Sequence, residues 1–260
     1  MLDRLTIIRH NHYDDVYKIK TNLQGDAALG LRIIDQKQLQ ILRDYQPKQR
    51  AQKSLMQAAV AMILRDGQNG TEVLLMQRAY HPKDPWSGQM AFPGGKIDPV
   101  DVSSKAAAIR EAFEEVGADL TEDDYIGQLD DLYGLKMDKI FTVHIACYIF
   151  KPERDLDLVG NEEVADMVWM PLAHLQDRAN AHDLVHPTDP SIVTPAVMIN
   201  EQKSQILWGL SLRMLSNLNA VLGCEMAVLN EEQNQILRDI ENREVSPDIA
   251  ESIEAEMREA

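Results

Sequence analysis

The stretch "AFPGGKIDPVDVSSKAAAIREAFEEVGADL", residues 91–120, joins a glycine-rich turn to a pattern typical of a helix. Ser103 or Ser104 is a suitable N-cap, because a serine hydroxyl accepts a hydrogen bond from the free backbone N–H groups of a first helical turn. Gly117 is a typical stop signal, since glycine readily adopts the left-handed conformation that ends many helices. We therefore predict a helix that begins at one of these serines and ends at Val116.

Three glutamates gather on one side of this predicted helix. At 100° per residue, Glu114 and Glu115 lie within about 60° of Glu111. Like charges at these spacings destabilise a helix by about 0.2–0.5 kcal/mol per pair, and they also crowd the negative end of the helix dipole. The opposite side is expected to face the core, and it carries Ile109, Ala112, Phe113 and Val116.

A bound divalent cation would offset the repulsion between these carboxylates. Mg²⁺ and Mn²⁺ prefer carboxylate oxygens and keep coordination positions for water and phosphate groups. The glycine pair before the helix lets the backbone approach phosphates closely. A solvated acidic face is the alternative for an isolated E-x-x-E-E string, but this one directly follows Arg110 and the "PGG" turn.

Residues 95–118 resemble the Nudix box, the pattern G-x5-E-x7-R-E-U-x-E-E-x-G-U in which U is aliphatic. Gly95 opens the match, and "REAFEEVGA" from Arg110 to Ala118 completes it. Asp101 stands where the first glutamate is expected, and eight residues rather than seven separate it from Arg110. The wider resemblance to this family covers about residues 55–222.

The one-residue insertion, together with "LLMQRA" and "SGQMAFPGGK" upstream, resembles the coenzyme A pyrophosphatase branch of the family. The signature of that branch has an L-L-T-x-R-[S/A] strand leading through Arg and Gly to F-P-G-G. Here Met76 replaces the threonine, and Lys83 stands near the position of the arginine. The spacing from Lys83 to Gly88 is one residue longer than in the branch.

The resemblance implies an α+β fold, with an α/β/α sandwich around a mixed sheet. It also implies hydrolysis of a diphosphate linkage in a nucleotide derivative, with Mg²⁺ or Mn²⁺ as cofactor. Coenzyme A or an acyl-coenzyme A, cleaved to phosphopantetheine and adenosine 3',5'-bisphosphate, is the expected substrate. ADP-ribose, a dinucleotide or a nucleoside triphosphate is the near alternative, and a non-catalytic ligand-binding module with a tail that docks a partner is a third.

Four glutamates are the candidate catalytic residues. Glu114, Glu115 and Glu111 are the expected metal ligands, and the resemblance adds the carbonyl of Gly95. Glu111 has an alternative role in orienting the attacking water. Glu163, in "NEEV", is a candidate general base or outer metal ligand, with an exposed acid at a strand edge as the other interpretation.

The expected substrate-binding residues are basic or belong to the glycine turn: Arg78, Lys83, Gly94, Gly95 and Lys96. A solvated loop lysine is the alternative for Lys83. Asp101 and Arg110 are assigned to structural support, as an ion pair that clamps the loop against the start of the helix while Arg110 points away from the acidic centre.

Other segments carry recognisable element patterns. A short helix is predicted at "QKQLQILRDY", residues 36–45. Two strands, residues 55–66 and 71–79, read as a hairpin around the turn signal "GQNG". Further strands are expected at residues 126–134 and 140–150, a strand running into a short helix at 162–177, a loop at 181–196, and a second long helix at 205–223.

Two further pairs of residues receive no functional role. His182 and His186, in the predicted loop, are weak candidates for metal ligands because no third ligand accompanies them. Trp86 and Trp208 fit a packing role as well as a stacking one.

The composition of the chain limits which partners and cellular locations are expected. The formal net charge is -16 and the pI about 4.8, which opposes binding to nucleic acid or to anionic membranes. Two cysteines without C-x-x-C spacing, and no apolar run long enough for a membrane span, favour a cytoplasmic protein. We expect an N-terminal extension at 1–50, a Nudix domain at 51–225 and an acidic tail at 226–260, and the family analogy leaves a homodimer open.

Overall fold

The computed structural model describes residues 33–49, 56–68, 70–82, 84, 86–135, 141–187 and 189–241. Within these ranges, eight strands form one mixed sheet and three form a second, smaller sheet. Lys83 lies outside the described residues, as do most of the predicted N-terminal extension and the last part of the acidic tail.

The centre of the large sheet is the hairpin of β1 (Met56–Gly67) and β2 (Gly70–Arg78), as the sequence predicted. Strand β7 (Phe141–Phe150) runs parallel to β1 along one of its edges. The other edge is shared, because residues 64–67 pair with β2 whereas residues 58–60 pair with β4 (Gly94–Lys96). The strands β3 (Met90–Ala91), β5 (Tyr125–Gln128), β6 (Leu132–Leu135) and β8 (Val164–Pro171) complete this sheet.

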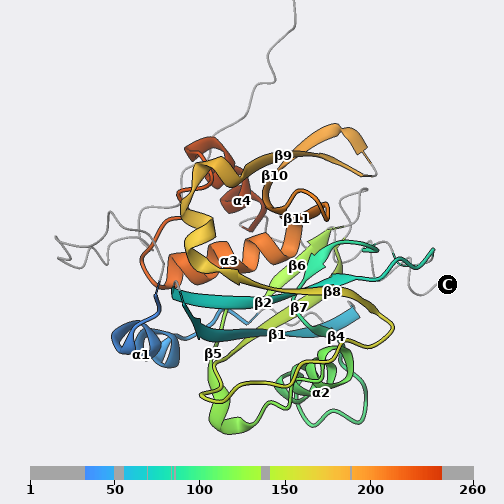
Figure 1. Cartoon of the computed structure of the whole chain (residues 1–260), viewed down its shortest axis with the longest axis vertical. Helices are drawn as coiled ribbons and strands as arrows, with labels where there is room; N and C mark the ends of the chain where they lie inside the picture. Colours follow the sequence, from blue (N-terminus) through green and yellow to red (C-terminus); the bar gives the residue numbers. More distant parts are fainter. Residues whose placement is uncertain are drawn as a thin grey trace, which may run out of the picture.

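Helices cover both faces of the sheet (Figure 1). Helix α2 (Ser104–Val116) lies on one side, and α3 (Gly209–Val221) lies on the other. The side chains of β7 alternate between the two resulting cores, as expected for a strand buried on both faces: Val143, Ile145, Cys147 and Ile149 belong to one, and Ala146, Tyr148 and Phe150 to the other. The predicted α/β/α sandwich is therefore confirmed.

Small side chains bring α2 close to the sheet. Ala107, Ala108 and Ala112 of the helix and Ala59 and Ala61 of β1 are all fully buried in one cluster. Alanine projects only a methyl group, so the helix backbone can approach the strand more closely than larger residues would allow. This packing places the glutamate-bearing helix beside the glycine turn at β4.

The segment predicted as a loop at residues 181–196 is instead a hairpin, so that prediction was wrong. It contains β9 (Ala181–His186) and most of β10 (Asp189–Asn200), which also pairs with β11 (Gln205–Trp208). The prolines argued against a strand here, because proline within a strand removes a backbone N–H. Pro195 is tolerated because β11 pairs with β10 only from Ala196 onward, so one edge is open at Pro195.

The second long helix begins later than predicted. Residues 205–208 form β11, and α3 starts at Gly209, which has a φ of 60°. The predicted stop signal at Gly223, with a φ of 68°, follows the helix closely. Pairing of residues 205–208 with β10 therefore overrides the helical spacing of the apolar residues there.

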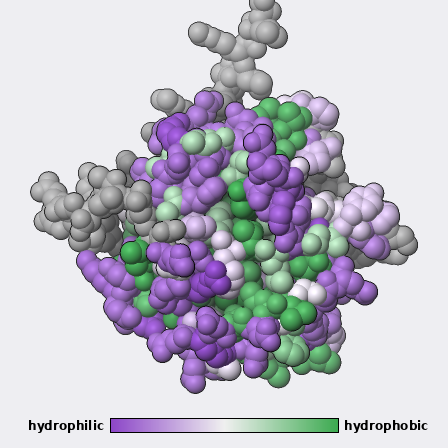
Figure 2. Space-filling view, viewed as in Figure 1, coloured by the Kyte–Doolittle hydropathy of each residue, from purple (hydrophilic) through white to green (hydrophobic). Residues whose placement is uncertain are grey.

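The segments flanking the predicted domain pack onto it where they are described. Helix α1 (Gln36–Asp44) ends one residue before its predicted end and buries Leu39 and Leu42. Leu229, just before α4 (Glu231–Glu241), and Leu237, within it, join the same cluster. The domain boundaries at 50 and 226 stay predictions. No helix of the described part has the length and apolar character required to cross a bilayer, and Figure 2 shows hydrophilic residues over most of the visible face.

The short 3-10 helices are η1 (Glu122–Asp124), η2 (Leu172–Gln176) and η3 (Arg178–Asn180). Asp124, at the end of η1, anchors the loop that follows α2. Its carboxylate accepts hydrogen bonds from Arg154 Nη1 at 2.6 Å and Nη2 at 2.9 Å, and from the N–H and hydroxyl of Thr121 at 2.8 and 2.9 Å. Burial alone would raise the pKa of Asp124, but these hydrogen bonds outweigh it and hold the pKa below its usual range.

Asp124→Asn is expected to lower the melting temperature at pH 7 and to lower it less at about pH 3. The folded-state pKa is depressed, so the ionised Asp124 contributes its full stabilisation above the ordinary aspartate pKa of 3.8 and loses it as the pH falls from there through the lower folded-state pKa. Thermal unfolding at the two pH values measures this, with the neighbouring Asp123→Asn as control. An equal loss at both pH values would contradict the assignment.

Candidate active site

The predicted helix at the centre of the site is confirmed as α2. Ser103 is the N-cap, and its hydroxyl oxygen accepts a hydrogen bond from the Ala106 N–H at 3.1 Å. Gly117 adopts the left-handed conformation with a φ of 69°, and its N–H donates to the Phe113 carbonyl at 3.0 Å. Local capping chemistry therefore sets both ends of the helix.

The orientation of α2 differs from the prediction. Glu115 is only 3% exposed, whereas Phe113, predicted to face the core, is 59% exposed. The buried side is centred between Ala112 and Glu115, so the acidic stripe borders the core instead of lying opposite it. Two of the three carboxylates are thereby directed at the glycine turn and the third at the protein surface.

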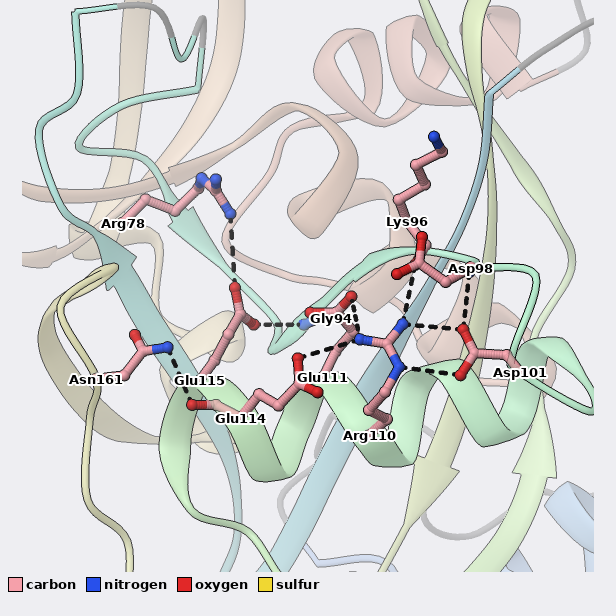
Figure 3. A network of polar contacts seen from close by, with 10 residues as sticks. All are labelled: Arg78, Gly94, Lys96, Asp98, Asp101, Arg110, Glu111, Glu114, Glu115 and Asn161. Carbon is pink, nitrogen blue, oxygen red and sulfur yellow. Dashed lines mark hydrogen bonds and ion pairs between the residues drawn. The ribbon is translucent and has the colours of Figure 1, made fainter.

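The glycine turn touches both inward carboxylates (Figure 3). The Gly94 N–H donates to Glu115 Oε2 at 2.8 Å. A Cβ at Gly95 would lie only 2.6 Å from Glu111 Cδ, so the missing side chain makes room for that carboxylate. The pairing of β4 with β1 holds this backbone in place.

Arg78, at the end of β2, supplies a positive charge beside the buried glutamate. Its Nη1 lies 3.8 Å from Glu115 Oε1, while its Nε and Nη2 donate to Asp84 Oδ2 at 2.9 and 2.8 Å. The loop that holds Asp84 is closed at its base, since the Arg78 N–H donates to the Gln89 carbonyl and the Gly88 N–H to the Arg78 carbonyl. No motif marks Asp84 in the sequence, where it is one acid in a proline-containing loop.

Burial is the largest influence on the pKa values of Glu111 and Glu115, and it raises both. It raises the pKa of Glu115 to about 7, with the charges of Glu111 and Glu163 adding to the rise and the Gly94 N–H and Arg78 opposing it. Burial also raises the pKa of Glu111, and the charges of Glu114 and Glu163 contribute. The structure therefore brings Glu163, from the turn before β8, within electrostatic range of both.

Arg110 connects the loop to the acidic stripe. The predicted ion pair with Asp101 is present and bidentate, with both N–O distances at 2.9 Å, and it holds the pKa of Asp101 below its usual range. Arg110 does not point away from the acidic centre as predicted, because its Nη1 donates to Glu111 Oε1 at 2.9 Å and Glu114 Oε2 at 3.1 Å. Its Nη2 also donates to the Lys96 carbonyl at 3.2 Å, and Figure 3 shows the Lys96 side chain extending away from the carboxylates.

The two histidines given no role by the sequence lie outside this group. His182 and His186 lie on one face of β9, where an i,i+4 spacing separates residues by roughly 13 Å. The ring of His186 packs edge-on against Trp208, with centroids 5.4 Å apart. This contact gives His186 and Trp208 a packing role.

Comparison with known proteins identifies the family of this chain. The family model described as NUDIX domain matches residues 55–189, more than half of the chain. The chain belongs to the Nudix family. It is 32% identical over 115 residues to a probable Nudix hydrolase of Schizosaccharomyces pombe, covering 44% of this chain and 39% of that protein.

Further similarity extends to bacterial Nudix proteins. The uncharacterized Nudix hydrolase NudL of Yersinia pestis is 30% identical over 148 residues, covering 56% of this chain and 70% of NudL. Among solved structures, the NUDIX domain of Shewanella oneidensis NrtR complexed with ADP ribose is 27% identical, with a TM-score of 0.39, covering 52% of this chain and 82% of that one. The chain thus spans well under half of the length of the yeast relative and 70% of NudL.

The donor set of α2, from here on called the Nudix helix, suits a hard divalent cation. Its side chains offer carboxylate oxygens, their charges repel one another, and Gly95 leaves space for Glu111. In the described ranges no three His, Cys, Asp or Glu side chains form a preformed metal site. Figure 3 shows Glu114, whose side chain is 53% exposed, turned toward Arg110, and Arg110 Nη1 also donates to Glu111.

Arg110→Lys is expected to lower the hydrolytic activity proposed below by about 10- to 100-fold, as is typical when a group that orients metal ligands is replaced. A lysine ammonium cannot reproduce the bidentate pair with Asp101 while also reaching Glu111 and Glu114. Steady-state kinetics measure this, and Arg65→Lys, in the Arg65–Glu72 ion pair of the hairpin, is the control. Equal activity in both variants would show that Arg110 does not organise the site.

Proposed function

We propose that this Nudix chain hydrolyses a diphosphate linkage in a nucleotide derivative, with Mg²⁺ or Mn²⁺ as cofactor. The observation that carries the proposal is the position of Glu115, buried to 3% exposure yet bonded through its carboxylate to the Gly94 N–H. Burying a carboxylate beside Glu111 is costly for the protein alone. A cation in this place makes the arrangement favourable, so the cost is consistent with a functional site.

Glu111, Glu114, Glu115 and the carbonyl of Gly95 would hold the cation. When bound, such an ion neutralises charge on the phosphates and makes a bound water more acidic. The Gly94 N–H fixes the orientation of the Glu115 carboxylate. Arg110 restrains Glu111 and ties the helix to the loop through Asp101.

Glu163 is the proposed general base. Its side chain is exposed, and it lies on an element separate from the Nudix helix, so its carboxylate is free to accept a proton from the attacking water. Its charge acts on both Glu111 and Glu115, which supports a position beside the cluster.

The basic residues and the glycine turn are the proposed binding groups for the phosphates of the substrate. Arg78 lies beside Glu115 and is oriented by Asp84, so its guanidinium is held at the edge of the carboxylate cluster. Gly94, Gly95 and Lys96, with Lys83 from the adjoining loop, are the further proposed contacts. Such local cations are required because the net charge of -16 repels an anionic substrate.

Coenzyme A or an acyl-coenzyme A is the proposed substrate, with phosphopantetheine and adenosine 3',5'-bisphosphate as products. Support comes from the segments "LLMQRA" and "SGQMAFPGGK", which resemble the signature of that branch. In the fold these segments form β2 and the β3–β4 region, and both border the acidic cluster.

A substrate panel tests the function. Coenzyme A, ADP-ribose, a diadenosine polyphosphate and a nucleoside triphosphate are each incubated with the protein and Mg²⁺ or Mn²⁺, and products are separated by chromatography. We expect release of adenosine 3',5'-bisphosphate from coenzyme A only when a metal is present. Turnover of another compound alone would correct the substrate, whereas binding without any turnover would establish a ligand-binding module.

A further inference from the structure

A tight turn precedes β8 and carries Glu163 at its third position. The Val164 N–H donates to the Asn161 carbonyl at 3.2 Å, which closes a four-residue turn. The Glu163 N–H donates to the Asn161 side-chain oxygen Oδ1 at 2.8 Å. An asparagine at the first position of a turn typically makes this bond to the residue two places later, and here it fixes the backbone of Glu163.

The same asparagine also forms hydrogen bonds to the end of the Nudix helix (Figure 3). Its side-chain Nδ2 donates to the Glu114 carbonyl at 3.0 Å, and its backbone N–H donates to the Glu115 carbonyl at 2.9 Å. The last carbonyls of a helix have no partner within the helix, so they are available for such bonds. Asn161 therefore attaches to the backbone of two of the proposed metal ligands.

A second attachment holds Glu163 from the opposite side. The Ala79 N–H donates to the Glu163 carbonyl at 2.8 Å, and Ala79 directly follows Arg78. The backbone of Glu163 is thus fixed between the end of β2 and the end of α2. Since the Glu163 side chain is exposed, these backbone bonds set the region that its carboxylate can reach.

We propose that Asn161 is a positioning residue that sets the place of Glu163 relative to the carboxylates of the Nudix helix. The inference rests on the proposed function of Glu163 as general base and goes beyond the Nudix motif, which ends at residue 118. Asn161 is suited to the task because an amide offers a donor and an acceptor at once. Alanine offers neither, and serine can keep the bond to the Glu163 N–H but is too short to reach the Glu114 carbonyl.

The test compares Asn161→Ala and Asn161→Ser with the wild type in metal-dependent hydrolysis. We expect kcat to fall about 10- to 100-fold in Asn161→Ala, with KM changed by less than about 3-fold, and to fall less in Asn161→Ser. The matched control is Asn180→Ala, because Asn180 Nδ2 donates to the His174 carbonyl at 3.0 Å, a similar bond away from the acidic cluster. Its kcat should equal that of the wild type.

A double-mutant cycle with Glu163→Gln separates positioning from mere stabilisation of the fold. If Asn161 acts through Glu163, Asn161→Ala should lower kcat by less than about 2-fold when Glu163→Gln is already present. Multiplicative losses, unchanged kcat in Asn161→Ala, or an effect confined to the melting temperature would each overturn the inference. If Asn161→Ala does not fold, Asn161→Ser decides by the same criteria, and a wild type that is inactive toward every substrate overturns the proposed function itself.

Discussion

Glu115→Gln is expected to abolish hydrolysis, with kcat reduced by about 10³-fold or more. The substitution removes one negative charge and one metal-ligand oxygen from the buried side of the cluster while keeping the volume of the side chain. A loss of about 4 kcal/mol of transition-state stabilisation corresponds to this factor, and metal-ion catalysis supplies energies of that order. Steady-state kinetics with saturating Mg²⁺ or Mn²⁺ measure it.

The same variant should fold normally. The glutamine side-chain oxygen can still accept the bond from the Gly94 N–H, and the repulsion from Glu111 and Glu163 is removed. We expect the melting temperature of the metal-free protein to change by less than about 4 °C. Glu72→Gln, in the hairpin ion pair with Arg65, is the control and should stay active. Full activity of Glu115→Gln would remove Glu115 from the catalytic centre.

Gly94→Ala is expected to cause the largest loss of stability. A Cβ at Gly94 would lie 2.4 Å from the Ala59 carbonyl oxygen and 2.5 Å from Val60 Cα, and these backbone atoms belong to the central strand β1. Neither can move without disturbing the sheet, so we expect a cost of about 3 kcal/mol. For a domain of this size this corresponds to a fall in melting temperature of about 6–12 °C.

Gly95→Ala provides the matched comparison one residue away. There the added Cβ meets the end of a flexible side chain, Glu111, at 2.6 Å, and that side chain can turn aside. We therefore expect a nearly unchanged melting temperature but a loss of activity, because the carboxylate leaves its place. Thermal unfolding and kinetics on both variants test the pair. A greater loss of stability in Gly95→Ala than in Gly94→Ala would contradict the described register of β4.

Features set by neighbouring residues were predictable from the sequence. The limits of α2 follow from Ser103 and Gly117, which act within one turn of the helix. The hairpin of β1 and β2 follows from two apolar runs joined by a short turn. The ion pair of Asp101 and Arg110 was predictable because the family pattern places an acid and an arginine at those positions.

Features that depend on packing between distant segments were not predictable. Angular position on α2 could not show that Glu115 is buried and Phe113 exposed, since this depends on which side faces β1. The second set of bonds made by Arg110 depends on the approach of the loop to the helix. Asn161 lies 45 residues beyond the end of α2 at Val116, and nothing local marks its contact with the helix.

The prolines of residues 181–196 illustrate a different limit. They are usual signs of a loop, yet the strand β10 accommodates Pro195 because only one neighbour is present there. Pairing partners decide whether a missing N–H matters, and the sequence alone does not name the partners.

The closed base of the loop between β2 and β3 links two sides of the candidate site. Gln77 pairs with Met90, and the backbone of Arg78 bonds to Gln89 and Gly88, so the chain leaves the sheet after Arg78 and rejoins it beside the same residue. Within this loop the Ala79 N–H donates to the Glu163 carbonyl, and Asp84 accepts a hydrogen bond from the Arg78 guanidinium. A replacement loop would therefore preserve the site only if it kept both contacts.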